Sequence, residues 1–451
     1  MISKPSQDKV RFWLTIMVIA GLSLWIRVSY FHSTYIDKPM RGDAASYVQY
    51  ALNLVNYGTF SKDRESVNPR PDAYWPPGYP ALLATAMQME KRFGISFYET
   101  TLYTQAVIGA LIAVVTLLIG RLFLNHYAAT LAALFVAFSP HLISLGGYLL
   151  TETLFSFALL LSIYVYLIAF RLKSGWLFLL SGLAFGLAYL VNPVVFFAPV
   201  LFAGLTLYLY RHHQQNSMRT ASRLVLPSLL AFFLIVGGWS ARNLINVSDS
   251  ALDGSERLFT NLVIGMHHDY HAIWRANPRD PNNPATVDER QLKGSYPALA
   301  SMLIGRIGEA PLHFAHWYLV QKPIRLWDWN ILTGQGDIYV YPVEYSLYDI
   351  SNAALLSYAV MRSAHYWLFG FALLGLIFVY RQVKVSDPAV SAPLFLYVSL
   401  VYVSAVYVVA QAEARYSIPM RPEMYLCAVY FLSELVRSMR ERRLKSGEQT
   451  A

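Results

Sequence analysis

Cysteine is almost missing from this sequence, which has only Cys427 among its 451 residues. A single cysteine cannot form an intrachain disulfide, so a disulfide-stapled fold is excluded and redox chemistry is not expected. Charge is scarce as well, because Asp, Glu, Lys and Arg make up 14% of the chain, against about 25% in soluble proteins. Hydrophobic residues make up 56%. A soluble fold of this composition could not cover its core with polar surface, so the composition predicts a polytopic membrane protein.

Several motifs that mark soluble enzymes are also absent. The sequence has no glycine-rich phosphate loop, no zinc-ligand spacing and no nucleophile elbow. These absences disfavour a nucleotide-using enzyme of the cytoplasm. The net charge of +9 would suggest a nucleic-acid partner for a soluble protein. Here the basic residues gather in tails and short links beside apolar runs, and no nucleic-acid partner is expected.

Long apolar runs predict an all-α fold with about ten transmembrane helices, because about 20 apolar residues span a bilayer as a helix. The first run follows basic residues and is not followed by a small-residue cleavage site, so we expect a retained span. The expected spans cover residues 12–31, 104–120, 127–145, 152–170, 175–190, 194–210, 224–244, 363–380, 390–410 and 419–437.

Basic residues in the short connections predict the orientation, because they favour the cytoplasmic side. Links that contain Arg121, Arg171 and Arg223 alternate with links that contain no basic residue. Both termini are therefore expected in the cytoplasm, and residues 32–103 and 245–362 outside. This divides the chain into an N-terminal transmembrane module (1–244) that includes the first external loop, an external region with interfacial helices (245–362), and C-terminal transmembrane helices with a basic cytoplasmic tail (363–451).

Two carboxylates stand at the expected external surface. Asp43 follows the first span, and Glu152 opens the span that begins at residue 152. Asp43 could simply cap the helix that follows it, and Glu152 could simply suit a helix N-terminus. Alternatively, Asp43 is a general base toward a hydroxyl nucleophile, and Glu152 orients an acceptor or holds a cation. These residues are the candidate catalytic groups.

Arginines recur at the same expected face. Arg242 lies where one span leaves the membrane, and Arg415 and Arg421 lie where the last span begins. Such side chains often reach only to lipid headgroups. A guanidinium also pairs bidentately with phosphate and stays charged when it is partly desolvated. Acids and guanidiniums at one membrane face suit a hydroxyl acceptor and a lipid-phosphate leaving group, so these arginines are candidate phosphate ligands.

A histidine-rich stretch from His267 to His271 could suggest a metal site. Adjacent histidines point in different directions, however, and no supporting ligand spacing surrounds them. We interpret this stretch as a solvated or substrate-contacting loop and predict no metal ligands. No cofactor is expected, although the sequence leaves open a divalent cation.

The ordered set of residues resembles the C-type (GT-C) membrane glycosyltransferases. Asp43 with Tyr47, the run Tyr-Trp-Pro-Pro-Gly-Tyr-Pro at 74–80, and Arg415 with Tyr416 carry this resemblance, together with Glu152 and Arg242. The most similar patterns are those of bacterial protein O-mannosyltransferases and of the aminoarabinose and galacturonic acid transferases. One departure is that Ala44 follows Asp43, where the protein mannosyltransferases carry an Asp-Glu pair.

This resemblance implies transfer of a sugar, with inversion, from a polyprenyl-phosphate donor to a lipid, glycan or protein acceptor. The reaction would take place at the external face of the bacterial inner membrane. It implies that Asp43 is the base and that Glu152 is a second acid. It also implies that Arg242, Arg415, Tyr416, Arg421, Tyr47 and Tyr74 contact substrate.

The competing hypothesis is a transporter or flippase of lipid-linked sugars. Transporters place charges and broken helices near the middle of the bilayer. In this sequence the unusual residues gather instead at the ends of the expected spans, which favours the enzyme.

Overall fold

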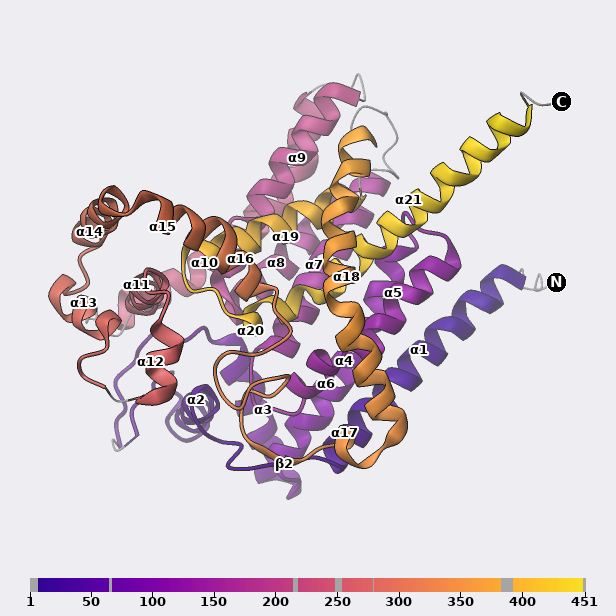
Figure 1. The fold of residues 1–451 in the computed structure, drawn as a ribbon. Coiled ribbons are helices and arrows are strands. Elements are labelled where there is room, and N and C mark those ends of the chain that lie inside the picture. The colour runs from indigo at the N-terminus through magenta and orange to yellow at the C-terminus, as the bar shows by residue number, and fades with distance from the viewer. Residues whose placement is uncertain are drawn as a thin grey trace.

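The computed structural model describes residues 7–64, 67–213, 218–247, 254–278, 280–382 and 392–448, and these ranges are mostly helical (Figure 1). Seven helical segments there are long and apolar enough to cross a membrane. The expected all-α polytopic membrane fold is confirmed. The seven segments are α1 (Gln7–His32), α4 (Phe97–Gly120), α7 (Glu152–Leu172), η1 with α9 (Pro193–Val195 and Ala198–His213), α10 (Met218–Asn246), α18 (Asn352–Gln382) and α19 (Ala392–Val409).

The three other expected spans coincide with helices of different character. The run 127–145 is divided into α5 (His126–Phe138) and α6 (Pro140–Leu145), because Pro140 cannot donate a backbone hydrogen bond into a continuing helix. The run 175–190 forms α8 (Gly175–Val191), which has 17 residues. The last run forms α21 (Arg421–Glu448), whose second half is strongly charged.

The two expected external segments contain short helices and two strands, and the strands join the segments to each other. The first holds β1 (Tyr35–Ile36), α2 (Asp43–Tyr57) and α3 (Gly78–Phe93). Strand β1 pairs antiparallel with β2 (Val343–Tyr345) of the second segment. The second segment also holds α11 (Gly254–Gly265), α12 (Tyr270–Ala276), α13 (Pro284–Leu292), α14 (Tyr296–Glu309), α15 (Pro311–His316), the π-helical η3 (Trp317–Gln321), α16 (Lys322–Leu326) and α17 (Leu347–Ile350).

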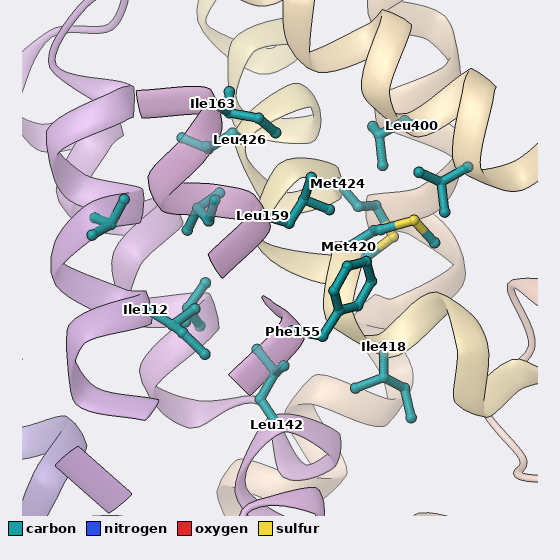
Figure 2. Packing of buried hydrophobic residues seen from close by; sticks show 14 of the residues in the cluster. Ile112, Leu142, Phe155, Leu159, Ile163, Leu400, Ile418, Met420, Met424 and Leu426 are labelled. Carbon is teal, nitrogen blue, oxygen red and sulfur yellow. The ribbon is translucent and has the colours of Figure 1, made fainter. Parts of the chain in front are cut away.

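The main core lies between the spanning helices and is apolar. Figure 2 shows side chains from α4, α6, α7, α19 and α21 meeting around Phe155 and Met420. A smaller, separate core around Phe259 and Leu292 holds part of the segment 245–362 together. The start of α1 and the end of α21 lie at one side of the molecule, and α2 and β2 lie at the other (Figure 1). The short α20 (Ala414–Ser417) and η5 (Ile418–Met420) connect α19 to α21 through the middle of the fold.

Candidate functional site

Asp43 is the first residue of α2, and its backbone position depends on the glycine before it. Gly42 has φ of 55°, a left-handed conformation that L side chains rarely adopt. The N-cap residue is Gly42, which has no side chain to accept from the first turn. Asp43 therefore does not act as the cap, and its carboxylate is available for other contacts.

The guanidinium of Arg415 joins the two candidate carboxylates. Its Nη1 donates to Oδ2 of Asp43 at 2.9 Å, and its Nε donates to Oε1 of Glu152. Three elements thus meet at one cation: α2 supplies Asp43, α7 supplies Glu152 as its first residue, and α20 supplies Arg415. The structure brings together residues that the sequence could only assign to one face of the membrane.

The two carboxylates differ in their exposure to solvent. The Asp43 side chain is 35% exposed, whereas the Glu152 side chain is 7% exposed and that of Arg415 10%. Oε2 of Glu152 is fully buried and has no hydrogen-bond partner in the part of the chain that the structure describes. A buried acceptor without a partner is costly, so Glu152 depends on the bond from Arg415 for its stabilisation.

Aromatic side chains form the wall beside Asp43. Tyr47 is buried, and its ring lies edge-on to Trp75 at 4.9 Å and to Tyr79 at 5.3 Å between centroids. Burial raises the pKa of Tyr47, the charges of Asp43 and Glu152 raise it further, and Arg415 and Arg257 oppose this rise. The Tyr47 phenol therefore stays neutral and can only form hydrogen bonds or pack against a ligand.

Tyr74 and Tyr416 belong to the same region. Tyr74 packs against Trp75, and Nζ of Lys62 lies 4.2 Å from the centre of the Tyr74 ring. Tyr416 stacks on Tyr407 with 5.0 Å between centroids. Their rings supply flat apolar surface, which suits packing against the face of a sugar ring.

Arg242 is engaged with the first of the two expected external segments. Its Nη1 donates to the carbonyl of Asp72 at 2.7 Å, and its Nη2 donates to the carbonyl of Phe60 at 3.3 Å. Its guanidinium also lies over the rings of Phe60 and Trp239. These contacts differ from the expected phosphate contact, and among the described residues none joins Arg242 to Asp43 or Glu152.

Arg421 is fully buried and belongs to another polar network. Its Nη1 lies 2.9 Å from Nδ1 of His141, and its Nη2 donates to the carbonyl of Asp328 at 3.0 Å. His141 in turn contacts the carbonyl of Trp329. Arg421 thus anchors the segment around residue 328 between α6 and α21, and no hydrogen bond or ion pair connects it to Arg415 in the described ranges.

Sequence reasoning did not single out three residues that the structure places at the site. Glu413 is buried two positions before Arg415, and an acid so close to an arginine was a signal available in the sequence. The hydroxyl of Tyr341 accepts from the backbone N–H of Ala44 at 3.4 Å. Arg257 lies over the ring of Trp75 at 4.6 Å. Tyr341 and Arg257 come from the second of the two expected external segments, far from Asp43 in the sequence, so no local pattern could assign them to Asp43.

His267 of the histidine-rich stretch belongs to a polar cluster with Asp288 and Arg306. His267 lies 2.7 Å from Asp288, which also pairs with Arg306. Burial lowers the pKa of His267, while Asp288 opposes this shift. In the described part of the chain, no group of three or more His, Cys, Asp or Glu side chains is arranged to hold a metal ion.

The fold and part of the sequence are similar to known glycosyltransferases. The model of the family described as dolichyl-phosphate-mannose-protein mannosyltransferase matches residues 83–240. That match includes Glu152, whereas Asp43 and Arg415 lie outside it. No curated protein matches the sequence.

Among solved structures, the archaeal oligosaccharyltransferase AglB from Archaeoglobus fulgidus, in complex with an inhibitory peptide and a dolichol-phosphate, superposes with a TM-score of 0.54 and 14% identity. The superposition covers 98% of this chain and 52% of AglB, so the chain spans about half the length of that protein. This likeness shows a shared fold. ArnT from Cupriavidus metallidurans, bound to undecaprenyl phosphate, gives a TM-score of 0.39 with 13% identity over 93% of this chain and 78% of ArnT.

Proposed function

We propose that this chain, a multi-pass membrane glycosyltransferase of the C type related to the dolichyl-phosphate-mannose-protein mannosyltransferase family, uses a polyprenyl-phosphate sugar donor. The acceptor is a hydroxyl-bearing lipid, glycan or protein at the external face of the inner membrane. The observation that carries this proposal is the shared guanidinium of Arg415, which holds Asp43 and Glu152 together beside an aromatic wall. Two acids and one cation, with the Asp43 side chain partly exposed to solvent, suit transfer of a sugar to a hydroxyl. The family whose model matches the sequence supports a lipid-phosphate donor.

The different exposure of the two acids supports a different role for each. A general base must reach the acceptor hydroxyl directly, and only Asp43 is exposed enough for this. Among the described residues, its Oδ1 accepts no side-chain hydrogen bond, so that oxygen is free to take the proton. Glu152 is buried against Arg415 and fixes the guanidinium.

The reaction is a direct displacement at the anomeric carbon. The acceptor hydroxyl attacks as Asp43 removes its proton, a new glycosidic bond forms, and the bond between the sugar and the phosphate oxygen breaks. The configuration inverts because attacking and leaving oxygens lie on opposite faces. Proton removal by a positioned base contributes about 10²–10⁴-fold to such a rate.

The leaving phosphate needs a cation on the opposite side of the sugar from Asp43. Arg415 is already shared by two carboxylates, and Arg242 and Arg421 donate to backbone carbonyls. Arg257 contacts no carboxylate among the described residues, and its guanidinium stacks on Trp75. Stacking leaves the N–H edge of a guanidinium free to donate to phosphate oxygens. We therefore assign Arg257 to the donor phosphate.

A transfer assay tests the function directly. Purified protein is reconstituted into sealed proteoliposomes with polyprenyl-phosphate sugars and is given an envelope-lipid and glycan acceptor pool, without ATP or an ion gradient. The expected result is release of polyprenyl phosphate together with a glycosylated product. Movement of intact donor across the membrane without bond cleavage would instead establish the flippase and refute the transferase.

A further inference from the structure

Glu413 is a buried acid whose contacts the proposed reaction does not use. It lies between α19 and α20, two residues before Arg415, and its residue is 2% exposed. Its Oε1 accepts two hydrogen bonds from a single residue: one from the backbone N–H of Thr333 at 3.0 Å and one from the Thr333 hydroxyl. A carboxylate that receives two donors from one residue is held in a defined orientation.

Thr333 begins a tight loop, residues 333–341, that returns to Asp43. Gly334 has φ of 93°, and a side chain there would collide with the carbonyl of Val340, so the loop folds closely on itself. At the other end of the loop, the Tyr341 hydroxyl accepts from the N–H of Ala44. The ring of Tyr341 also lies against Gly42. The loop therefore runs from Glu413 to both neighbours of Asp43.

Other contacts fix the middle of this loop. The hydroxyl of Ser144 donates to the carbonyl of Ile338 at 2.9 Å, and the hydroxyl of Tyr148 donates to the carbonyl of Tyr341 at 3.3 Å. These bonds attach the loop to α6 and to the residues that follow it. The Glu413–Thr333 bonds are the ones that attach its beginning to the segment that carries Arg415.

We propose that Glu413 is a positioning residue: by binding Thr333 it holds the 333–341 loop against α2 and so sets the placement of Asp43 relative to Arg415. This inference rests on the proposed function, because it assigns Asp43 and Arg415 to the reaction. Glu413 does not touch substrate in this scheme and acts through Thr333 and Tyr341.

The charge of Glu413 makes this arrangement sensitive to pH. Burial raises the pKa of Glu413 from 4.5 to about 7, with Arg415 and the Thr333 N–H opposing the rise and with Asp43 and Glu152 adding to it. The carboxylate accepts charge-assisted hydrogen bonds, which are roughly twice as strong as the bonds to a neutral acid. The loop is therefore held more firmly above pH 7 than below it.

Stability should change in the opposite direction, which separates positioning from a purely structural role. The folded pKa of Glu413 lies above its ordinary value of 4.5, so the protonated form stabilises the fold and this contribution is lost as pH rises from 4.5 through 7. Transfer per folded molecule should rise with pH over the upper part of this window while stability falls. A residue that only stabilised the fold would leave transfer per folded molecule unchanged across this pH range.

The test measures transfer by the full chain between pH 6 and pH 8 in wild type, Glu413→Gln, Thr333→Val and Thr333→Ser. Glu289→Gln is a matched control, because Glu289 also accepts a hydrogen bond from a threonine hydroxyl, that of Thr260, within the segment 245–362 that contains Thr333. We expect kcat of the wild type to rise about tenfold across this range, as two charge-assisted bonds replace neutral ones. Glu413→Gln should stay near the low value at every pH with an unchanged donor KM. Thr333→Val should lower kcat, Thr333→Ser should restore it, and Glu289→Gln should behave as wild type.

A second measurement does not depend on turnover. Hydrogen exchange of residues 333–341, corrected for the intrinsic pH effect, should show more protection at pH 8 than at pH 6 in wild type and Glu289→Gln. The difference should vanish in Glu413→Gln.

An unchanged pH profile and unchanged protection in Glu413→Gln would overturn the inference. A wild type without transfer but with this pH-dependent protection would refute the proposed function and leave the role of Glu413 in holding the loop intact. If Glu413→Gln fails to fold, Thr333→Val tests the same inference. Wild-type kcat and wild-type protection in Thr333→Val would also overturn it.

Discussion

Replacing Arg415 with Gln should destabilise the protein more than replacing either carboxylate that it binds. Arg415→Gln leaves Glu152 as a buried charge without a cation, which typically costs about 3–5 kcal/mol. Glu152→Gln removes a charge-assisted hydrogen bond worth about 1.5–3 kcal/mol while Asp43 still neutralises the guanidinium. Asp43→Asn breaks a partly exposed pair and should cost about 1 kcal/mol or less.

The double variant Arg415→Gln with Glu152→Gln provides the sharpest comparison. Two neutral amides can bond to each other without a buried charge, so the double variant should be more stable than Arg415→Gln alone. The assay is equilibrium unfolding of the purified protein in detergent at pH 7.5, with each variant compared with wild type. Two results would refute this reasoning about buried charge. One is a double variant whose loss of unfolding free energy equals the sum of the two single losses. The other is a loss for Asp43→Asn as large as that for Arg415→Gln.

Four further outcomes test the site and its orientation. Asp43→Asn should lower transfer by about 100-fold or more while donor binding is retained, and a remaining rate above about a tenth of wild type would remove Asp43 from catalysis. Arg257→Gln should weaken binding of plain polyprenyl phosphate by about tenfold to 150-fold, whereas the exposed Arg290→Gln should not, and equal affinity in both variants would exclude the phosphate role. Arg242→Gln should make the first external loop more sensitive to limited proteolysis without changing affinity for polyprenyl phosphate, because Arg242 binds that loop's carbonyls. A probe cysteine at Asn282 should react with a membrane-impermeant thiol reagent in intact cells, and labelling only after the inner face is opened would reverse the topology.

Much of the fold could be predicted because each membrane span corresponds to one continuous apolar run in the sequence. A helix needs about 20 apolar residues to cross a bilayer, and runs such as 104–120 and 152–170 fall inside α4 and α7. The break between α5 and α6 was missed because apolar content outweighed Pro140 in a run otherwise long enough to span. The pairing of β1 with β2 joins Tyr35 to Tyr345 and could not be predicted, since strands this short leave no periodic pattern.

The membership of the site was less predictable than the fold. Arg242 and Arg415 look alike in the sequence, since each stands where a span meets the expected external face. What separates them is which backbone or carboxylate oxygens the loops bring within reach. Arg242 meets carbonyls of the folded first loop, whereas Arg415 meets Asp43 from 372 positions away. Such contacts depend on how both external segments pack, and no spacing rule encodes them.

The unequal exposure of the two acids also determines which bond of Arg415 can weaken during the reaction. The Glu152 bond is buried, so breaking it would leave a buried charge without a cation. The Asp43 bond is made by Oδ2, is partly exposed and contributes little, so it can weaken at small cost when the proton arrives at Oδ1 and neutralises the carboxylate. In the proposed mechanism, Arg415 therefore stays fixed on Glu152 while its bond to Asp43 weakens. The same guanidinium that orients the base before binding then remains beside it as a fixed positive charge, while the proton moves to the carboxylate.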